Sequence, residues 1–131
     1  MELEVSSAVL DALVTLAAAA HPDECCGILL GQGAAITALT PARNVHPQTQ
    51  RHFEIDPQAL IGAFRGARSG GPQVLGYYHS HPAGLPAPSA TDQREAPRDG
   101  RVWAIVAGTT VQFWRDQKHG FEPLSYVAVS A

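Results

Sequence analysis

The sequence predicts an α/β domain of the mixed kind, an α+β fold in which a central mixed β-sheet is flanked by helices. Three observations favour this class. Apolar residues recur at helical spacing in two segments, near residues 7–20 and 56–68, and residues 89–98 can form a further short helix. Short apolar runs bounded by glycine, proline or polar residues, as strands are, lie between and after these segments. Helices that interleave with strands, with the last strands joined by short turns, are typical of such a domain.

Chain length and charge limit the possible functions. The chain has 131 residues, which suffices for one hydrophobic core but would leave two cores marginal, so residues 1–131 are expected to form a single domain. Hydrophobic residues make up 45% of the chain and charged residues 16%, a composition that excludes disorder for most of it. The formal net charge of −3 offers no basic field to a phosphate backbone. We therefore expect no nucleic-acid partner.

Hydrophobic spacing and helix breakers define the first helix and a hairpin after it. Ser6 and Ser7 can cap a helix that continues to about Ala20, and a proline two residues later ends it. The apolar run over residues 25–31 is too short for a helix and is expected to form a buried strand. A Gln-Gly turn follows, so residues 34–40 are expected to form the second strand of the hairpin.

A polar loop over residues 41–51 leads to the second helix. An aspartate followed by proline opens a helix over residues 56–68, because proline is tolerated at the first helical position. Leu60, Ile61 and Phe64 are expected on the buried face of this helix.

The remaining elements are a strand, a stiff loop, a short helix and a final run of strands. Their expected ranges are residues 73–79 for the strand, 82–88 for the proline-rich loop, 89–98 for the helix, and 101–107, 110–115 and 124–129 for the last three strands. Trp103 and Trp114 fall in these last strands and are expected in the core.

A metal site is predicted where the strand over residues 73–79 meets the proline-rich loop. His79 and His81 lie two residues apart, so both imidazoles project to the same side of a strand. The stiff loop then brings Asp92 from the first turn of the next helix. Two histidines and one aspartate leave the fourth position of a tetrahedral zinc ion open for water, which is the arrangement of catalytic sites. We expect one zinc ion per chain.

Ser89 and Asp92 also fit an ordinary helix start, in which a serine N-cap is followed by an acid three residues later. Both interpretations can hold together, because a cap would fix the position of Asp92. A His-x-His pair alone is a weak signal. The full pattern of His-x-His, seven residues and Ser-x-x-Asp arises by chance on the order of once in a thousand, well below the false-positive rate of a short motif.

The pattern His79-Ser80-His81, followed at the proper spacing by Ser89 and Asp92, resembles the signature of the JAMM (MPN+) zinc peptidases. Upstream, residues 22–31 are similar to the Glu-x-Cys-Gly-apolar-Gly segment of that family. Residues 43–57 are similar to the short bacterial and archaeal members. The resemblance extends from about Pro22 to the last strands, and it implies a cytidine-deaminase-like fold that hydrolyses peptide or isopeptide bonds.

The resemblance also implies a role for each matching residue. His79, His81 and Asp92 would hold zinc, Glu24 would be the general base, and Ser89 would hydrogen-bond the oxyanion or the attacking water. The charges agree with these roles, because zinc with two ionised carboxylates is near neutral and one proton can move through Glu24 to the leaving amine. Without the histidines, Glu24 would be interpreted as a solvated turn residue.

Two function classes remain after this resemblance. The first is a zinc peptidase that cuts after the C-terminal Gly-Gly tail of a ubiquitin-like or sulfur-carrier protein, as the short stand-alone length suggests. The alternative is a non-catalytic MPN-type protein-binding scaffold, although such scaffolds usually lack a ligand or the glutamate, which this chain keeps. Zinc nucleoside deamination would need a His-x-Glu motif together with a Pro-Cys-x-x-Cys motif, and the sequence has no Pro-Cys-x-x-Cys. The identity of the carrier and the oligomeric state stay open.

The other reactive residues carry weaker signals. Cys25 and Cys26 are adjacent in an apolar run and are expected to be small buried hydrophobic residues without a disulfide. His46 and His52 bracket the polar loop, either on the surface or at the rim of a cleft.

The N-terminal Met-Glu-Leu-Glu lacks the positive charge of a signal peptide, and the uncharged stretch 12–20 is too short to cross a bilayer. We therefore expect a cytoplasmic protein without a membrane partner.

Overall fold

A computed structural model describes residues 2–130 of the chain. Its elements, in chain order, are β1 (Leu3–Ser6), α1 (Ser7–Ala20), β2 (Cys26–Gln32), β3 (Ala35–Ala42), α2 (Pro57–Arg68), β4 (Gln73–Ser80), α3 (Ala90–Glu95), β5 (Val102–Ala107), β6 (Thr110–Gln117), β7 (Gly120–Leu124) and β8 (Tyr126–Val129).

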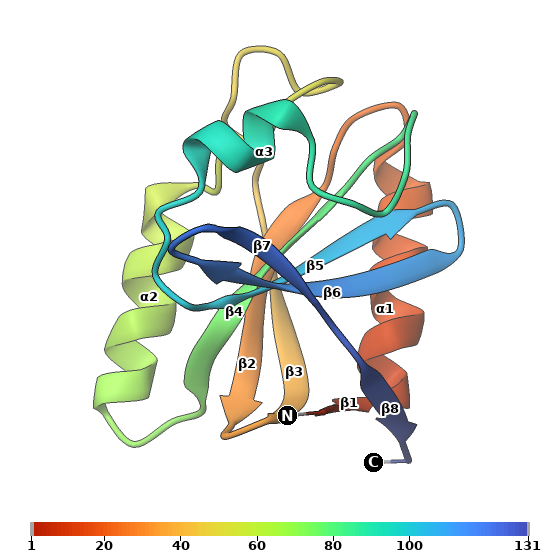
Figure 1. The fold of residues 1–131 in the computed structure, drawn as a ribbon. Coiled ribbons are helices and arrows are strands. Elements are labelled where there is room, and N and C mark those ends of the chain that lie inside the picture. The colour runs from red at the N-terminus through yellow and green to blue at the C-terminus, as the bar shows by residue number, and fades with distance from the viewer. Residues whose placement is uncertain (1, 131) are drawn as a thin grey trace.

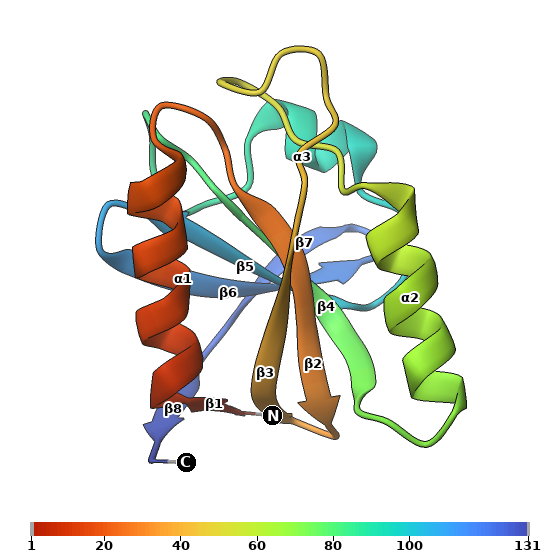
Figure 2. The same cartoon turned by 180° about the vertical axis from the view of Figure 1, so that it is seen from behind.

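The eight strands form one mixed sheet in the order β7-β6-β5-β4-β2-β3-β1-β8. Three pairs are parallel, namely β1 with β3, β1 with β8 and β4 with β5, and the other neighbours are antiparallel. The sheet is strongly twisted, with α1 and α2 on opposite sides of it and α3 across one end (Figures 1 and 2). The predicted mixed sheet flanked by helices is confirmed.

The hydrophobic core lies between α1 and the sheet. Val9 and Leu13 of α1 are buried there against strand residues such as Phe113 of β6. β5 crosses this core, and each residue over 102–106 is at most 5% exposed. A strand covered on both faces has a continuous apolar run instead of alternation, as Val-Trp-Ala-Ile-Val does here. Because β5 is the parallel neighbour of β4, it holds the strand that ends at the histidine pair.

The structure corrects three strand and helix boundaries. The strand predicted over residues 124–129 starts two residues later, as β8, which pairs with β1; β7, which pairs with β6 and lies at the opposite edge, was not predicted. β1 was not predicted, since four residues are too few to show alternation and its partners are distant in sequence. α3 ends at Glu95, not near residue 98, because Pro97 disfavours helical backbone at the residue before it.

α2 begins as predicted but buries a narrower face. Asp56 is its N-cap and accepts a backbone N–H of the first turn at 3.0 Å. Leu60 and Phe64 are half-buried, whereas Ile61 is 47% exposed, so its predicted burial is wrong. Successive residues are about 100° apart around a helix. Ile61 therefore cannot share the face of Leu60.

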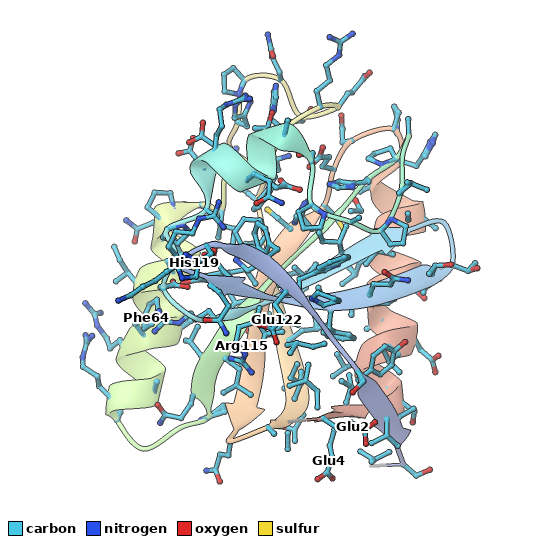
Figure 3. The ribbon with its side chains drawn as sticks, in the orientation of Figure 1. Glu2, Glu4, Phe64, Arg115, His119 and Glu122 are labelled. Atoms are coloured by element: carbon cyan, nitrogen blue, oxygen red, sulfur yellow. The ribbon has the colours of Figure 1, made fainter. Side chains whose placement is uncertain are left out.

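The candidate functional residues and the terminal strands lie at opposite ends of the molecule. β4 ends at Ser80, beneath the end that α3 covers (Figure 1). Glu2, just before β1, and Glu4, within it, are exposed at the far end (Figure 3). Across residues 2–130, no helix is long and apolar enough to cross a membrane.

Two glycines provide a matched test of the packing between β4 and β5. A Cβ added at Gly76 would overlap the main chain of Val102, whereas a Cβ added at Gly62 of α2 would have no atom within 4 Å. We expect Gly76→Ala to lower the free energy of unfolding by about 3 kcal/mol or more. Gly62→Ala should raise it by up to about 1 kcal/mol, because alanine is the better helix former. Urea unfolding measures the change in the free energy of unfolding for each variant. Equal changes in the two variants would contradict the close pairing of β4 with β5.

Candidate metal centre

Two histidines and an aspartate converge at the end of β4. His79 Nε2 lies 3.0 Å from His81 Nε2 and 3.1 Å from Asp92 Oδ2, and His81 Nε2 lies 3.2 Å from the same oxygen. His79 and Asp92 are buried, and His81 is half-buried. The structure thus brings together the three side chains that the sequence pattern singled out as ligands.

His81 is held through its main chain and through its ring. Its backbone N–H donates to the Val106 carbonyl of β5 at 2.8 Å. Its Nδ1 lies 2.8 Å from the Leu85 carbonyl oxygen in the proline-rich loop. Because a carbonyl can only accept, Nδ1 carries a proton, which leaves Nε2, the atom that faces the other two side chains, as the nitrogen that can serve as a ligand.

Asp92 is fixed by the start of α3. Ser89 is the N-cap, and its Oγ accepts the Asp92 backbone N–H at 3.0 Å. In return, Asp92 Oδ2 accepts the Ser89 backbone N–H at 2.9 Å. This is the capping box expected from the sequence. The same Oδ2 atom faces both histidine rings, so the cap orients the carboxylate toward them.

Burial disfavours charge on all three groups, and their mutual contacts reverse this for two of them. Burial opposes ionisation of Asp92, yet its hydrogen bonds with His79 and His81 hold the pKa of Asp92 well below its usual range. Burial lowers the pKa of His79, and the contact with Asp92 offsets this only in part. For His81, Asp92 and the Leu85 carbonyl outweigh burial and raise the pKa.

The spacing of the three ligand atoms fits a tetrahedral zinc ion. Around such an ion, with bonds of about 2.0–2.1 Å, ligand atoms lie about 3.3 Å apart. The distances of 3.0–3.2 Å in this group are within a few tenths of an ångström of that value. Two imidazole nitrogens with one carboxylate suit zinc better than calcium or magnesium, which prefer oxygen ligands.

Glu24 lies near this group, two residues before β2. It is 7% exposed. Burial raises the pKa of Glu24 from 4.5 to about 7, and the smaller influences are the charges of His81, which lowers it, and Asp92, which raises it. The carboxyl group therefore lies within electrostatic reach of two candidate ligands.

Strand pairing places Glu24 there. β2 runs antiparallel to β4 with Cys26 opposite His79. Just beyond this pair, the Ser80 backbone N–H donates to the Cys25 carbonyl at 3.1 Å, and the Cys25 backbone N–H donates to Ser80 Oγ at 2.9 Å. These two bonds tie the chain beside the glutamate to the chain between the histidines.

Asn44 is a second anchor for Glu24, and sequence analysis did not single it out. Its Nδ2 donates to the carbonyl oxygens of Glu24 at 3.0 Å and His52 at 2.9 Å. Its Oδ1 accepts the backbone N–H groups of His46 and Glu54, each at 3.1 Å. The amide thus connects the polar loop to Glu24, two residues before β2. The one available signal was that asparagine is common in turns, which does not identify its distant partner.

Aromatic rings enclose the buried histidine. Phe53 stacks on the His79 ring with centroids 4.1 Å apart, and Trp103 meets it edge-on at 5.5 Å. Trp103 is buried as predicted, but it also forms a wall of the metal group. The core prediction is wrong for Trp114, which is half-buried and donates its indole N–H to the Pro86 carbonyl at 3.1 Å.

The cysteines and loop histidines lie outside the group of three ligands. Cys26 is buried as predicted, and burial raises its pKa to about 12. Cys25 is half-buried, and burial raises its pKa as well, so both thiols stay neutral. The rings of His46 and His52 lie 4.8 Å apart in the polar loop.

Two hollows flank the metal group. One, of about 750 Å³, is lined by Glu24, His81, Ser89 and the proline-rich loop. The other, of about 600 Å³, is lined by the polar loop, by Trp103 and by Asp92. The candidate ligands therefore lie between two open spaces that a bound chain could occupy.

Residues 6–117 match the family described as prokaryotic homologs of the JAB domain. The chain is 38% identical over 93 residues to a desampylase of Haloferax volcanii, covering 70% of this chain and 67% of that protein. It is 35% identical over 88 residues to the probable TtuB-protein conjugate cleaving protease of Thermus thermophilus, covering 67% and 57%. It is 30% identical over 115 residues to the tail tip assembly protein K of Escherichia phage N15, covering 88% and 45%. The chain thus spans about half to two thirds of these curated relatives.

Solved structures share the fold. A protein from Desulfitobacterium hafniense superposes with a TM-score of 0.85 at 26% identity, covering 98% of this chain and 94% of that one. A JAB1/MPN domain protein from Archaeoglobus fulgidus gives 0.62 at 22% identity, covering 96% and 97%. A structure described as a metalloprotease-like JAMM zinc site also gives 0.62, at 21% identity, covering 97% and 99%. The fold that the sequence resemblance implied is confirmed.

Because of Glu24, the free energy of unfolding of the metal-free protein should depend on pH. With a pKa of about 7 in the folded protein and 4.5 when exposed, it is protonated in both states below pH 4.5. Between these values the unfolded chain loses the proton first, so stability falls as the pH rises toward 7. The free energy of unfolding of Glu24→Gln minus that of wild type should therefore grow by up to about 3 kcal/mol between the two pKa values. Denaturant unfolding of the metal-free proteins at several pH values measures it, and a constant difference would contradict a buried carboxyl.

Proposed function

The chain belongs to the family of prokaryotic JAB-domain homologs, and from this premise we propose that it is a zinc-dependent peptidase and isopeptidase. Its substrate is the peptide or isopeptide bond after the C-terminal Gly-Gly tail of a ubiquitin-like or sulfur-carrier protein. The observation that carries the proposal is the convergence of His79, His81 and Asp92 near a buried glutamate.

The names of two relatives support this class of reaction. One is a desampylase, and the other is described as a probable protease that cleaves TtuB-protein conjugates. A bond between a protein and a conjugated carrier is the kind of bond proposed here.

His79, His81 and Asp92 would hold the zinc ion through the two Nε2 atoms and Oδ2. When bound, zinc with an open fourth position supplies a water acidified to a pKa of about 7 and a charge that polarises a carbonyl. The Leu85 carbonyl orients one histidine, and the Ser89 cap orients the aspartate. Such outer partners hold metal ligands in place and tune their basicity.

Glu24 is the proposed general base. Its pKa of about 7 lies near neutral pH, where a carboxyl can both accept and return a proton. It accepts a proton from the attacking water and delivers it to the leaving amine. Asn44 holds the carbonyl of Glu24, and the bonds between Cys25 and Ser80 hold the residue after it, so the carboxyl keeps its place through both transfers.

Ser89 is the proposed donor to the oxyanion. Its oxygen accepts the Asp92 backbone N–H, which uses one lone pair and leaves the hydroxyl hydrogen free to donate. The residue is exposed and lines the same hollow as Glu24 and His81. It can therefore cap α3 and also stabilise developing negative charge.

The open spaces on the two sides of the ligands favour an extended substrate. Main-chain hydrogen bonds can hold such a tail, while the room for its side chains sets specificity. The buried ligands are reached between the polar loop and the proline-rich loop. Glycine before the cleaved bond lets the main chain approach without a Cβ in the way.

Two variants separate metal binding from proton transfer. We expect Glu24→Gln to keep zinc but to lose about 10²–10⁴ in rate, because it removes the proton acceptor. His79→Ala should lose zinc and activity while remaining folded. Metal analysis and mass spectrometry of a cleaved carrier conjugate measure both properties. An unchanged rate in Glu24→Gln would remove Glu24 from the mechanism, and a wild-type protein that binds zinc but cleaves no conjugate would favour the scaffold alternative.

A series of carrier tails tests the substrate preference. We expect a tail that ends in Gly-Gly-X to be cleaved at least about tenfold faster than Ala-Ala-X on the same carrier, because a methyl group before the bond hinders close approach. Initial rates at subsaturating substrate give the ratio. Equal rates would contradict the glycine preference and leave the zinc hydrolase proposal intact.

A further inference from the structure

The proline-rich loop after the second histidine is tied to the sheet by Trp114. This residue lies on β6, opposite Trp103 in the antiparallel pair of β6 with β5. Its indole N–H donates to the Pro86 carbonyl at 3.1 Å across 28 positions of sequence. Cross-strand partners lie on the same face of a sheet, so Trp114 projects from the face on which Trp103 meets the His79 ring.

The carbonyl next to this contact orients a metal ligand. Leu85, the residue before Pro86, accepts the Nδ1–H of His81 at 2.8 Å. The Leu85 side chain is 75% exposed, so its main chain provides the contact that matters to the histidine. In the described part of the chain, residues 82–88 form just these two hydrogen bonds.

A loop with so few hydrogen bonds depends on each of them. Prolines at 82, 86 and 88 limit its backbone, but they lack the N–H groups that would anchor it to neighbouring strands. Gly84, with a φ of 155°, adds a position of easy rotation between the histidine and its acceptor. The bond from Trp114 is thus what fixes the Leu85 carbonyl relative to the sheet.

We propose that Trp114 is a positioning residue for metal binding: it fixes the loop carbonyl that orients His81. This inference rests on the proposed zinc function and extends it to a residue that, among the described residues, has no hydrogen bond or ring contact with the three ligands. The indole is suited to the task, because its N–H is a donor only and its ring is rigid. Loss of the donor lets the Leu85 carbonyl move, and His81 then presents its Nε2 less often in the direction of the other ligands.

Trp114→Phe removes the donor and keeps an aromatic ring in the full-length protein. Tyr126→Phe is the matched control, because it also deletes an aromatic donor to a main-chain carbonyl, that of Val111, at 3.3 Å. Tyr126 lies in β8, far in the sheet order from the strand that carries the histidines. The readouts are zinc affinity by competition with a chromophoric chelator, the absorption spectrum of the cobalt-substituted protein and thermal unfolding of the metal-free protein.

We expect Trp114→Phe to bind zinc about tenfold more weakly than wild type, at the low end of the effect of losing an outer partner of a metal ligand. Its cobalt spectrum should change, whereas the zinc affinity and cobalt spectrum of Tyr126→Phe should match wild type. Both metal-free variants should unfold at similar temperatures. If Trp114→Phe does not fold, benzothienylalanine at position 114 keeps the indole shape without the N–H and is expected to give the same loss of affinity.

Three outcomes would overturn the inference. Zinc affinity within twofold of wild type in the variant that lacks the indole N–H would show that this donor does not orient the ligand. An equal loss in Tyr126→Phe would assign the effect to general stability. A wild-type chain that binds no zinc would overturn this inference together with the proposed function, whereas the first two results would leave the proposed function standing.

Discussion

The candidate site depends on the antiparallel pairing between the start of β2 and the end of β4. Two chains in adjacent strands lie about 4.8 Å apart, so this pairing sets the distance between Glu24 and the histidines before any side chain contributes. Cys26 opposite His79 fixes the register, and Ser80 adds a side-chain bond to Cys25 where the ladder ends. A shift by one residue would turn the histidine ring to the other face of the sheet.

Around this ladder the protein gathers polar groups that burial alone would disfavour. Each is held by a partner that belongs to the scaffold. A helix cap holds Asp92, the carbonyls of Val106 and Leu85 hold His81, and the Asn44 side chain and the Thr49 carbonyl hold the main chain of Glu24. A buried group with a strongly raised pKa, such as Glu24, costs stability and is typical of functional sites. The scaffold offsets this cost with the continuous apolar core around β5.

Local rules explain which parts of the site could be predicted from the sequence. His79 and His81 follow from strand alternation, and Ser89 follows from the rules of a helix start, so a few neighbouring residues contain the whole signal. Asn44 and Trp114 act on residues 20 and 28 positions away. Nothing near them in the sequence specifies those partners. The division of the C-terminal segment into β7 and β8 was missed for the same reason, since β7 pairs with β6 and β8 pairs with β1, far apart in the sheet order.

That division has a consequence for synthesis on the ribosome. β7 and β8 are separated by one residue, Ser125, yet they lie at opposite edges of the sheet, and β8 pairs in parallel with β1. Every candidate residue from Glu24 to Asp92 is therefore translated while β1 still lacks its outer neighbour. An unpaired strand edge is a template for other chains, and pairing over so long a sequence separation forms slowly. The nascent chain thus carries a complete set of metal ligands during the interval in which it is most exposed to misassociation.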